Sequence, residues 1–264
     1  MLPRLVLFLI GFSAVIAQVV LVRELIVVFH GNEASLGLML ASWLAWTAAG
    51  SSIAGYIHAR GDAHRKRITV LMALSAITFP VTIAAIRFSR GFLQTVPGEL
   101  LGPVSTLLAS ALVLAPFCLI SGALFAAGSR LWAAESSASP GEAGATVYLL
   151  EGIGSAVGGL IASLLLIRRL PPFGIAALLA WCNLTAAALL VGWRARRRTV
   201  AILFSATLIP VLAAGYPFLE RLTLARLWKG MDVLEARNSR YGNLVLVKTE
   251  DGTTLYENGL PLAT

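Results

Sequence analysis

Long hydrophobic runs separated by short polar segments dominate the first 216 residues of the chain. An α-helix needs about 20 consecutive, mostly apolar residues to cross the hydrocarbon core of a bilayer. The runs that reach this length cover residues 5–29, 35–57, 68–87, 104–127, 145–167, 174–193 and 199–216. The pattern therefore predicts an all-α membrane helix bundle of about seven transmembrane helices within residues 1–216.

A different pattern begins near the C-terminus. Strand-like residues at 241–249 and 253–257 are separated by Asp251 and Gly252 and are followed by Asn258 and Gly259. Asp-Gly and Asn-Gly tolerate the positive φ that a tight hairpin turn requires. The sequence predicts the start of a small antiparallel β-meander, cut within its third strand.

The domain boundaries follow from this change of pattern. We expect a multi-span transmembrane domain at 1–216, a linker at 217–238 and an incomplete β-hairpin unit at 239–264. Because an isolated hairpin is only marginally stable in water, we expect the last segment to belong to a larger domain.

Composition agrees with a membrane location. Hydrophobic residues make up 58% of the chain and charged residues 13%, whereas a soluble domain carries roughly 25% charge. The mean hydropathy is +0.82. We therefore expect a multi-pass protein of the cell membrane, with the lipid bilayer as its first partner.

The net charge of +8 comes entirely from residues 1–216, which contain 15 Lys and Arg and 7 Asp and Glu. Residues 217–264 contain 6 basic and 6 acidic residues. Most of the excess falls in two short loops at 60–67 and 194–198, which is typical of cytoplasmic loops and not of a nucleic-acid-binding surface. We expect no nucleic-acid partner. With both loops inside, the N-terminus is cytoplasmic, and seven crossings place the C-terminal tail outside.

Five polar residues fall within the hydrophobic runs: Gln18, Arg23, Glu24, Glu151 and Asn183. A charge at the centre of a bilayer costs at least roughly 2.5–3.5 kcal/mol, so such residues face protein or water and are candidate functional residues. Two interpretations stay open, a pathway for a substrate or protons and structural pairing between helices. Adjacent helical residues point in different directions, so Arg23 and Glu24 need partners elsewhere.

Small residues recur in the second and fifth runs, notably at Gly50, Gly55, Gly154, Gly158 and Gly159. Spacings of three and four residues let helix backbones approach closely in a membrane. We expect these glycines to form helix-packing faces, within one chain or in a homodimer.

Recognisable catalytic chemistry is not found in the sequence. Cys118 and Cys182 both lie in apolar runs, without the spacing of a disulfide framework or a metal site. We expect no catalytic, cofactor-binding or metal-binding residues within these 264 positions.

Three separate segments nonetheless resemble one family, bacterial membrane proteins whose C-terminal half is a spermidine synthase-like domain. The first segment contains Gly11-Phe12-Ser13, Val22-Arg23-Glu24-Leu25 and Phe29-His30-Gly31-Asn32; the second contains Val147, Tyr148, Gly152, Gly154, Ser155, Gly158 and Gly159; the third contains Ser239, Tyr241, Leu244, Val245, Asn258 and Gly259. The third resembles the N-terminal β-hairpin that precedes the catalytic domain of polyamine aminopropyltransferases.

This resemblance implies a parent enzyme of polyamine biosynthesis. Such an enzyme transfers an aminopropyl group from decarboxylated S-adenosylmethionine to a diamine such as putrescine. The implied partner is the C-terminal synthase-like domain, or its separate gene product, which would carry the Gly-rich loop and the acidic residues. The chain departs from the soluble members at Gly242, where they commonly carry Gln, and at Leu262, where they carry a second Gln.

Two questions stay open. Decarboxylated S-adenosylmethionine is cytoplasmic, whereas the basic loops place the tail outside, so the side occupied by the tail is undecided. The alternative function is a small-molecule transporter, of polyamines for example, in which the seven spans are the functional core.

Overall fold

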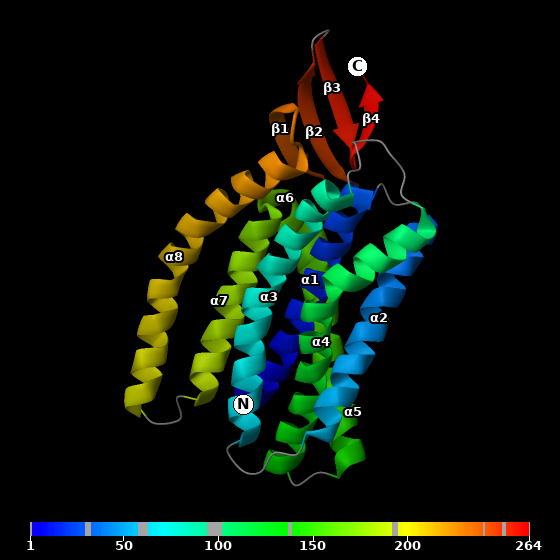
Figure 1. The fold of residues 1–264 in the computed structure, drawn as a ribbon. Coiled ribbons are helices and arrows are strands. Elements are labelled where there is room, and N and C mark those ends of the chain that lie inside the picture. Colours follow the sequence, from blue (N-terminus) through cyan, green and yellow to red (C-terminus); the bar gives the residue numbers. More distant parts are fainter. Residues whose placement is uncertain are drawn as a thin grey trace.

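A computed structural model of the chain describes residues 2–29, 33–57, 63–93, 102–136, 139–191, 195–239, 241–249 and 252–263. The helices form a bundle that carries a small sheet at one end, and the two termini lie at opposite ends of the molecule (Figure 1). The helical elements are α1 (Leu2–Phe29), α2 (Glu33–Tyr56), α3 (Ala63–Leu93), α4 (Pro103–Ser136), α5 (Pro140–Ile161), the π-helix η1 (Ala162–Leu166), α6 (Ile167–Arg169), α7 (Pro172–Val191) and α8 (Ala195–Leu227).

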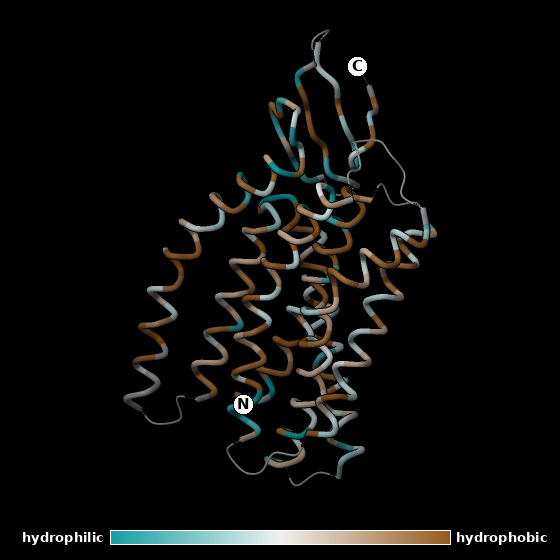
Figure 2. Tube along the Cα trace, in the orientation of Figure 1, coloured by the Kyte–Doolittle hydropathy of each residue, from teal (hydrophilic) through white to brown (hydrophobic). Residues whose placement is uncertain are grey.

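Seven helical segments within the described ranges are long and apolar enough to cross a membrane, with α5, η1 and α6 counted as one segment. This confirms the expected helix bundle and is compatible with a multi-pass membrane protein. Hydrophobic residues run along the helices, while the more hydrophilic positions gather toward the two ends and in the sheet (Figure 2).

Burial separates central helices from peripheral ones. In the most apolar stretch, half of the residues of α1 and 56% of those of α7 are buried, whereas none is buried in α8. The last helix packs on α7, where Trp181 Nε1 donates to the Ser205 hydroxyl at 3.0 Å. The interior of the bundle is therefore built around α1 and α7, and α8 lies on its outside.

Glycines bring α2 and α4 into backbone contact. A Cβ atom at Gly50 would overlap the backbone carbonyl of Leu119, and one at Gly122 would overlap that of Thr47. Trp46 Nε1 also donates to the Ala111 carbonyl at 2.8 Å. These two helices form a close pair along most of their length.

The α1 and α5 pair is built in the same way. A Cβ atom at Gly154 would overlap the Phe8 carbonyl, and one at Gly158 would press on the backbone of Phe12. A Cβ at Gly159 would stand in ordinary contact with a side chain, 3.4 Å from Val15 Cγ1.

Gly55 differs from the other glycines expected at packing faces, because nothing lies within 4 Å of the position of its Cβ. It belongs to the end of α2, where two arginines bind the terminal carbonyls. Arg67 Nη2 donates to Ala54 O at 2.9 Å, and Arg130 donates to the carbonyls of Gly55 and Ile57. These bonds satisfy acceptors that a helix C-terminus leaves without an intrahelical partner.

Proline does not end the last helix. α8 continues through Pro210 and Pro217 and ends at Leu227, so the first part of the expected linker is helical. Pro116 lies inside α4, whose N-terminal part leans away from the bundle near the sheet end (Figure 1). Proline removes one helical hydrogen bond and commonly kinks a helix without breaking it when the surroundings support both sides.

The sheet has four antiparallel strands in the order β1-β2-β3-β4, one more than the sequence suggested. They are β1 (Asp232–Asn238), β2 (Asn243–Thr249), β3 (Gly252–Glu257) and β4 (Leu260–Ala263). Within the expected linker at 217–238, the structure places residues 217–227 in α8 and residues 232–238 in β1, while the division into domains stays a prediction. The alternating strand signal of β1 is weak, because four of its seven residues are charged or Asn.

Asn258 and Gly259 form the turn between β3 and β4, with φ of 50° and 82°. Positive φ at both central positions is the geometry of a type I′ hairpin turn. Of the other expected turn, at Glu250, Asp251 and Gly252, the first two residues lie outside the described residues, and Gly252 begins β3.

The sheet packs on the bundle through a shared hydrophobic core. Leu227, Trp228, Val245 and Val247 belong to the same buried cluster as Phe29 of α1. The Trp228 ring meets the Tyr256 ring edge to face, with 5.1 Å between their centroids. The sheet is therefore held against one end of the bundle and is not an independent tail.

Candidate functional site

A buried cluster of charged side chains joins α1, α3 and α8 at the sheet end of the bundle. Arg87 Nε lies 2.6 Å from Glu24 Oε2, and its Nη2 lies 3.2 Å from Glu24 Oε1. Arg87 Nη1 lies 2.7 Å from Glu220 Oε1. One guanidinium thus holds two carboxylates, and the planar fork of Arg suits the two-point contact with Glu24.

Neighbouring groups satisfy the rest of this cluster. Arg87 Nη1 also donates to Thr223 Oγ1 at 2.9 Å, and that hydroxyl donates to Leu219 O at 2.8 Å. The backbone N–H of Phe173, at the start of α7, donates to Glu220 Oε2 at 3.1 Å. Arg87 is 3% exposed and Glu24 5%, so this pair is removed from solvent, and the cluster as a whole connects α1, α3, α7 and α8.

A second arginine links this cluster to the sheet. Arg90 lies one turn beyond Arg87; its Nη1 donates to Leu227 O at 3.4 Å, and its guanidinium lies 5.5 Å from the Trp228 ring centroid. Arg23 of α1 donates from Nη2 to Ser239 O, just after β1, at 2.8 Å. Arg23 therefore bonds directly to the connection between β1 and β2, and Arg90 supports the sheet through Trp228, which packs on Tyr256 of β3.

The chemistry of this cluster favours positioning over catalysis. Each carboxylate of the cluster contacts Arg87, and within the described ranges neither lies beside a hydroxyl or thiol in a nucleophile–base arrangement. A buried ion pair adds little net stability, but removing one partner is costly because a buried charge is left unpaired. The cluster can therefore lock the relative positions of α1, α3, α8 and the sheet.

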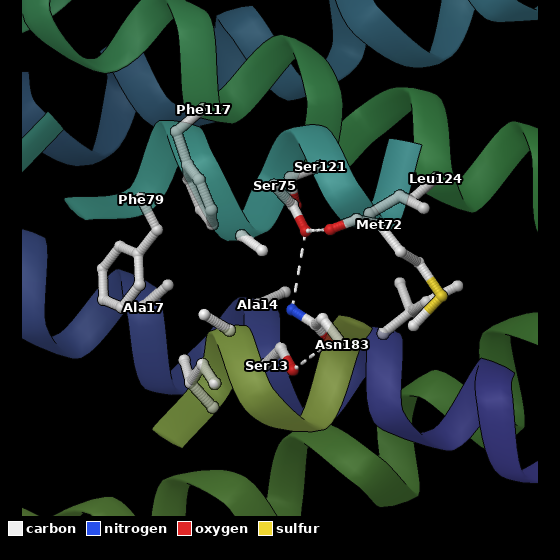
Figure 3. A pocket seen from close by; sticks show the side chains of 14 residues that line it. Ser13, Ala14, Ala17, Met72, Ser75, Phe79, Phe117, Ser121, Leu124 and Asn183 are labelled. Carbon is white, nitrogen blue, oxygen red and sulfur yellow. Dashed lines mark hydrogen bonds between the residues drawn. The ribbon is translucent and has the colours of Figure 1, made fainter. Parts of the chain in front are cut away.

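A small cavity, lined mostly by apolar side chains together with three serines and Asn183, lies deeper in the bundle, between α1, α3, α4 and α7 (Figure 3). Ser13 Oγ donates to Asn183 Oδ1 at 3.0 Å, and Asn183 Nδ2 lies 3.5 Å from Ser75 Oγ. Ser121 also lines the cavity, whose volume is about 20 Å³. A space of this size, with several polar groups around it, suits a single water molecule.

Glu151 occupies a third place, on the contact between α5 and α1. A Cβ at Gly11 would overlap its backbone carbonyl, and Ser155 Oγ donates to Gly11 O one turn away at 3.2 Å. Its Oε1 is buried and has no hydrogen-bond partner among the described residues. Its side chain belongs neither to the Asn183 cavity nor to the Arg87 cluster.

Gln18 and Arg23 lie on another face of α1, where they line an open groove between α1, α2 and η1. The structure thus separates the five polar residues singled out in the sequence into four locations. Only Gln18 and Arg23 share one, and Glu24 turns inward to Arg87 as expected for adjacent helical positions.

Sequence reasoning missed the residues that surround Glu24. Arg87 is the last residue of the third hydrophobic run and Arg90 lies just beyond it, a position typical of residues at a membrane surface, and Glu220 fell in the expected linker. One signal in the sequence could have predicted this cluster: charged residues lie near the same end of α1, α3 and α8. Of the residues expected in the hairpin, Tyr241 is 89% exposed, and Asn258 Oδ1 accepts from the backbone N–H of Asn243 at 2.9 Å.

Metal chemistry finds no support within the described ranges, where no group of three or more His, Cys, Asp or Glu side chains is placed to hold an ion. Comparison with known proteins adds no identification. No family model, no curated protein and no solved structure matches the chain.

Proposed function

We propose that this chain is the membrane platform of a spermidine synthase-like enzyme. In this proposal the helix bundle spans the cell membrane, and the sheet carries and orients a domain that transfers an aminopropyl group from decarboxylated S-adenosylmethionine to a diamine. The chain itself supplies anchoring and orientation. The resemblance of the segments around Gly11, Gly154 and Tyr241 to that family supports the assignment of the parent activity.

The observation that carries the proposal is the docking of the sheet on the bundle. A flexible tether would serve to retain a domain at a membrane, but here Trp228 packs between Arg90 and Tyr256, and the hydrophobic core runs from α1 into β2. Inter-domain motion is the default unless an interface is large and apolar. This interface favours one fixed orientation of the sheet relative to the bundle.

The proposal requires the sheet to face the cytoplasm, where decarboxylated S-adenosylmethionine is made, and so places the N-terminus outside. The two basic loops favour the reverse orientation. However, the sheet end of the bundle also gathers basic residues, which reduces the bias between the two ends. They are Arg23, Arg87, Arg90, Arg168, Arg169, Arg221, Arg226 and Lys229.

Cysteine labelling in intact cells tests this orientation. Lys248 is exposed on β2, and Ser136 is exposed at the end of α4 farther from the sheet. A membrane-impermeant maleimide is expected to label Ser136→Cys from outside and Lys248→Cys only after permeabilisation. The parent chain, with Cys118 and Cys182 alone, is the control. Labelling of Lys248→Cys in intact cells would contradict the proposal.

An activity measurement tests the enzyme class. Tagged chain is purified from the membranes of its own host in mild detergent, and the eluate is assayed for methylthioadenosine released from decarboxylated S-adenosylmethionine with putrescine. Activity should accompany the chain and decline in Trp228→Ala, in which the sheet loses its packing. Lys229→Ala, one residue further and exposed, is the matched control.

Small-molecule transport is the second candidate, favoured by the cavity that contains Asn183 and three serines. That cavity has room for about one water molecule and is separated from Glu24 and Glu151, so transport requires the helices to move apart. Uptake of labelled putrescine and spermidine by cells overproducing the chain tests it, with Asn183→Leu expected to abolish uptake. Equal uptake with and without the chain would remove this candidate.

A further inference from the structure

An open groove at the sheet end of the bundle is lined by α1, α2 and η1. Its volume is about 420 Å³, and most of its wall is apolar, with Val19, Val22, Leu36, Leu40 and Ile167 among the lining residues. It lies on the outside of the bundle, where lipid would be the neighbour if the helices span a bilayer. The shape and composition of the wall suit an acyl chain.

One end of this groove carries positive charge. Arg23 lines the groove and is half-buried, and Gln18 lies about one and a half turns below it on α1. Arg168 and Arg169 follow directly after Ile167 and are exposed. Among the described residues, Glu33 in the first turn of α2 is exposed, and Glu24 turns away toward Arg87. The three arginines therefore leave an excess of positive charge at this end of the groove.

The position of Arg23 matches the depth of a lipid headgroup. It lies six residues before the end of α1, about 9 Å along the helix axis. Its Nη2 donates to Ser239 O, in the connection between β1 and β2, which marks this level as the boundary between bundle and sheet. Arginine near a membrane surface attracts anionic lipids and binds phosphate through its planar fork.

The π-helix η1 contributes the third wall. Ser163 and Leu164 of η1 both line the groove. π-Helical turns are rare and occur frequently at functional sites. Interruption of the regular helix at this place, and not elsewhere in the described helices, is consistent with a wall shaped for a ligand.

We propose that this groove binds one anionic phospholipid, with its phosphate against Arg23 and one acyl chain along the apolar wall. The inference rests on the membrane location proposed above and is independent of the synthase activity. The bound lipid would bridge the arginine that holds Ser239 and the face of α2, and so would tie membrane composition to the seating of the sheet.

A second groove provides an internal comparison. It lies between α3 and α4 at the same end of the bundle, has a volume of about 720 Å³, and includes Val113 in its wall. None of the residues that line it is charged. It should accept acyl chains with no preference for the headgroup, although it is the larger of the two.

Native mass spectrometry of the full chain tests the proposal. The purified chain is delipidated in detergent and given equimolar phosphatidylglycerol and phosphatidylcholine with identical acyl chains. One retained phosphatidylglycerol is expected, with a preference of about five-fold for each arginine that faces the phosphate. Equal retention of the two lipids would overturn the proposal.

Substitutions locate the site. Leu40→Trp fills the groove and leaves every charge in place, so it should abolish the preference; Arg23→Gln should also abolish it. Val113→Trp, a matched change at a half-buried position in the uncharged groove, should keep it. A preference that survives Leu40→Trp, or that Val113→Trp removes, would refute the assignment. The orientation assay with Lys248→Cys reports separately on the proposed function.

Discussion

Replacing Arg87 by Met should destabilise the chain more than any other single change of a charged residue in the bundle. Arg87 makes two bonds to Glu24, one ion pair to Glu220 and one bond to Thr223. Methionine keeps the apolar stem but leaves both carboxylates without their cation. Breaking a buried ion pair in this way costs about 3–5 kcal/mol, a large share of a total stability of roughly 5–15 kcal/mol.

A compensating variant separates this effect from simple loss of packing. It combines Arg87→Met with Glu24→Met and Glu220→Gln, so that the buried charges disappear together. The amide oxygen introduced by Glu220→Gln can still accept from the Phe173 backbone N–H, as the carboxylate does in the parent chain. Replacing all members of a buried ion pair is often close to neutral. The triple variant should therefore recover most of the stability that Arg87→Met loses.

Reversible unfolding in mixed detergent micelles, followed by tryptophan fluorescence, gives the free energies of unfolding. Arg221→Met is the matched control, because Arg221 lies next to Glu220 in sequence but is exposed, and a surface change of this kind should stay within about 0.5 kcal/mol of the parent. The reasoning is refuted if Arg87→Met also stays within that range, or if the triple variant is no more stable than the single one.

Three further outcomes are expected. Gly50→Ala should lower stability by about 1–3 kcal/mol, since the added methyl overlaps the backbone of α4; thermal unfolding should show Gly55→Ala, with open space around it, closer to the parent. Asn183→Leu should cost about 1–3 kcal/mol in the same assay, because Ser13 loses its acceptor in a buried site. Trp228→Leu should make the sheet sensitive to limited proteolysis while the bundle fragment stays intact, and equal cleavage rates would contradict the proposed docking.

The sequence alone predicted the helices because their signal is local. Each hydrophobic run is long enough to form a helix whose backbone groups bond within the same segment, and neighbouring helices are not needed to recognise it. The same holds for Asn258 and Gly259, where the positive φ of a tight turn selects the residue types directly. The end of α8 was harder to predict, since the last hydrophobic run stops at residue 216, whereas the helix continues through Pro217 to Leu227.

The partners of the charged residues required the tertiary structure. Arg87 meets Glu24 across 63 positions of sequence and Thr223 across 136, and the pairing depends on which helices are neighbours and on how each is rotated. Glu24 and Arg23 are adjacent in sequence, yet one is buried in an ion pair and the other lines a groove below the sheet.

Local hydrophobicity thus determined which segments become helices, and turn chemistry determined where a hairpin forms, because both preferences act within a few residues. The packing of α1 against α3, α5 and α7 decided the meeting of Glu24 with Arg87, the cavity at Asn183 and the seating of the sheet on Trp228. Those features depend on close contacts between segments far apart in the chain, and no single run of sequence contains them.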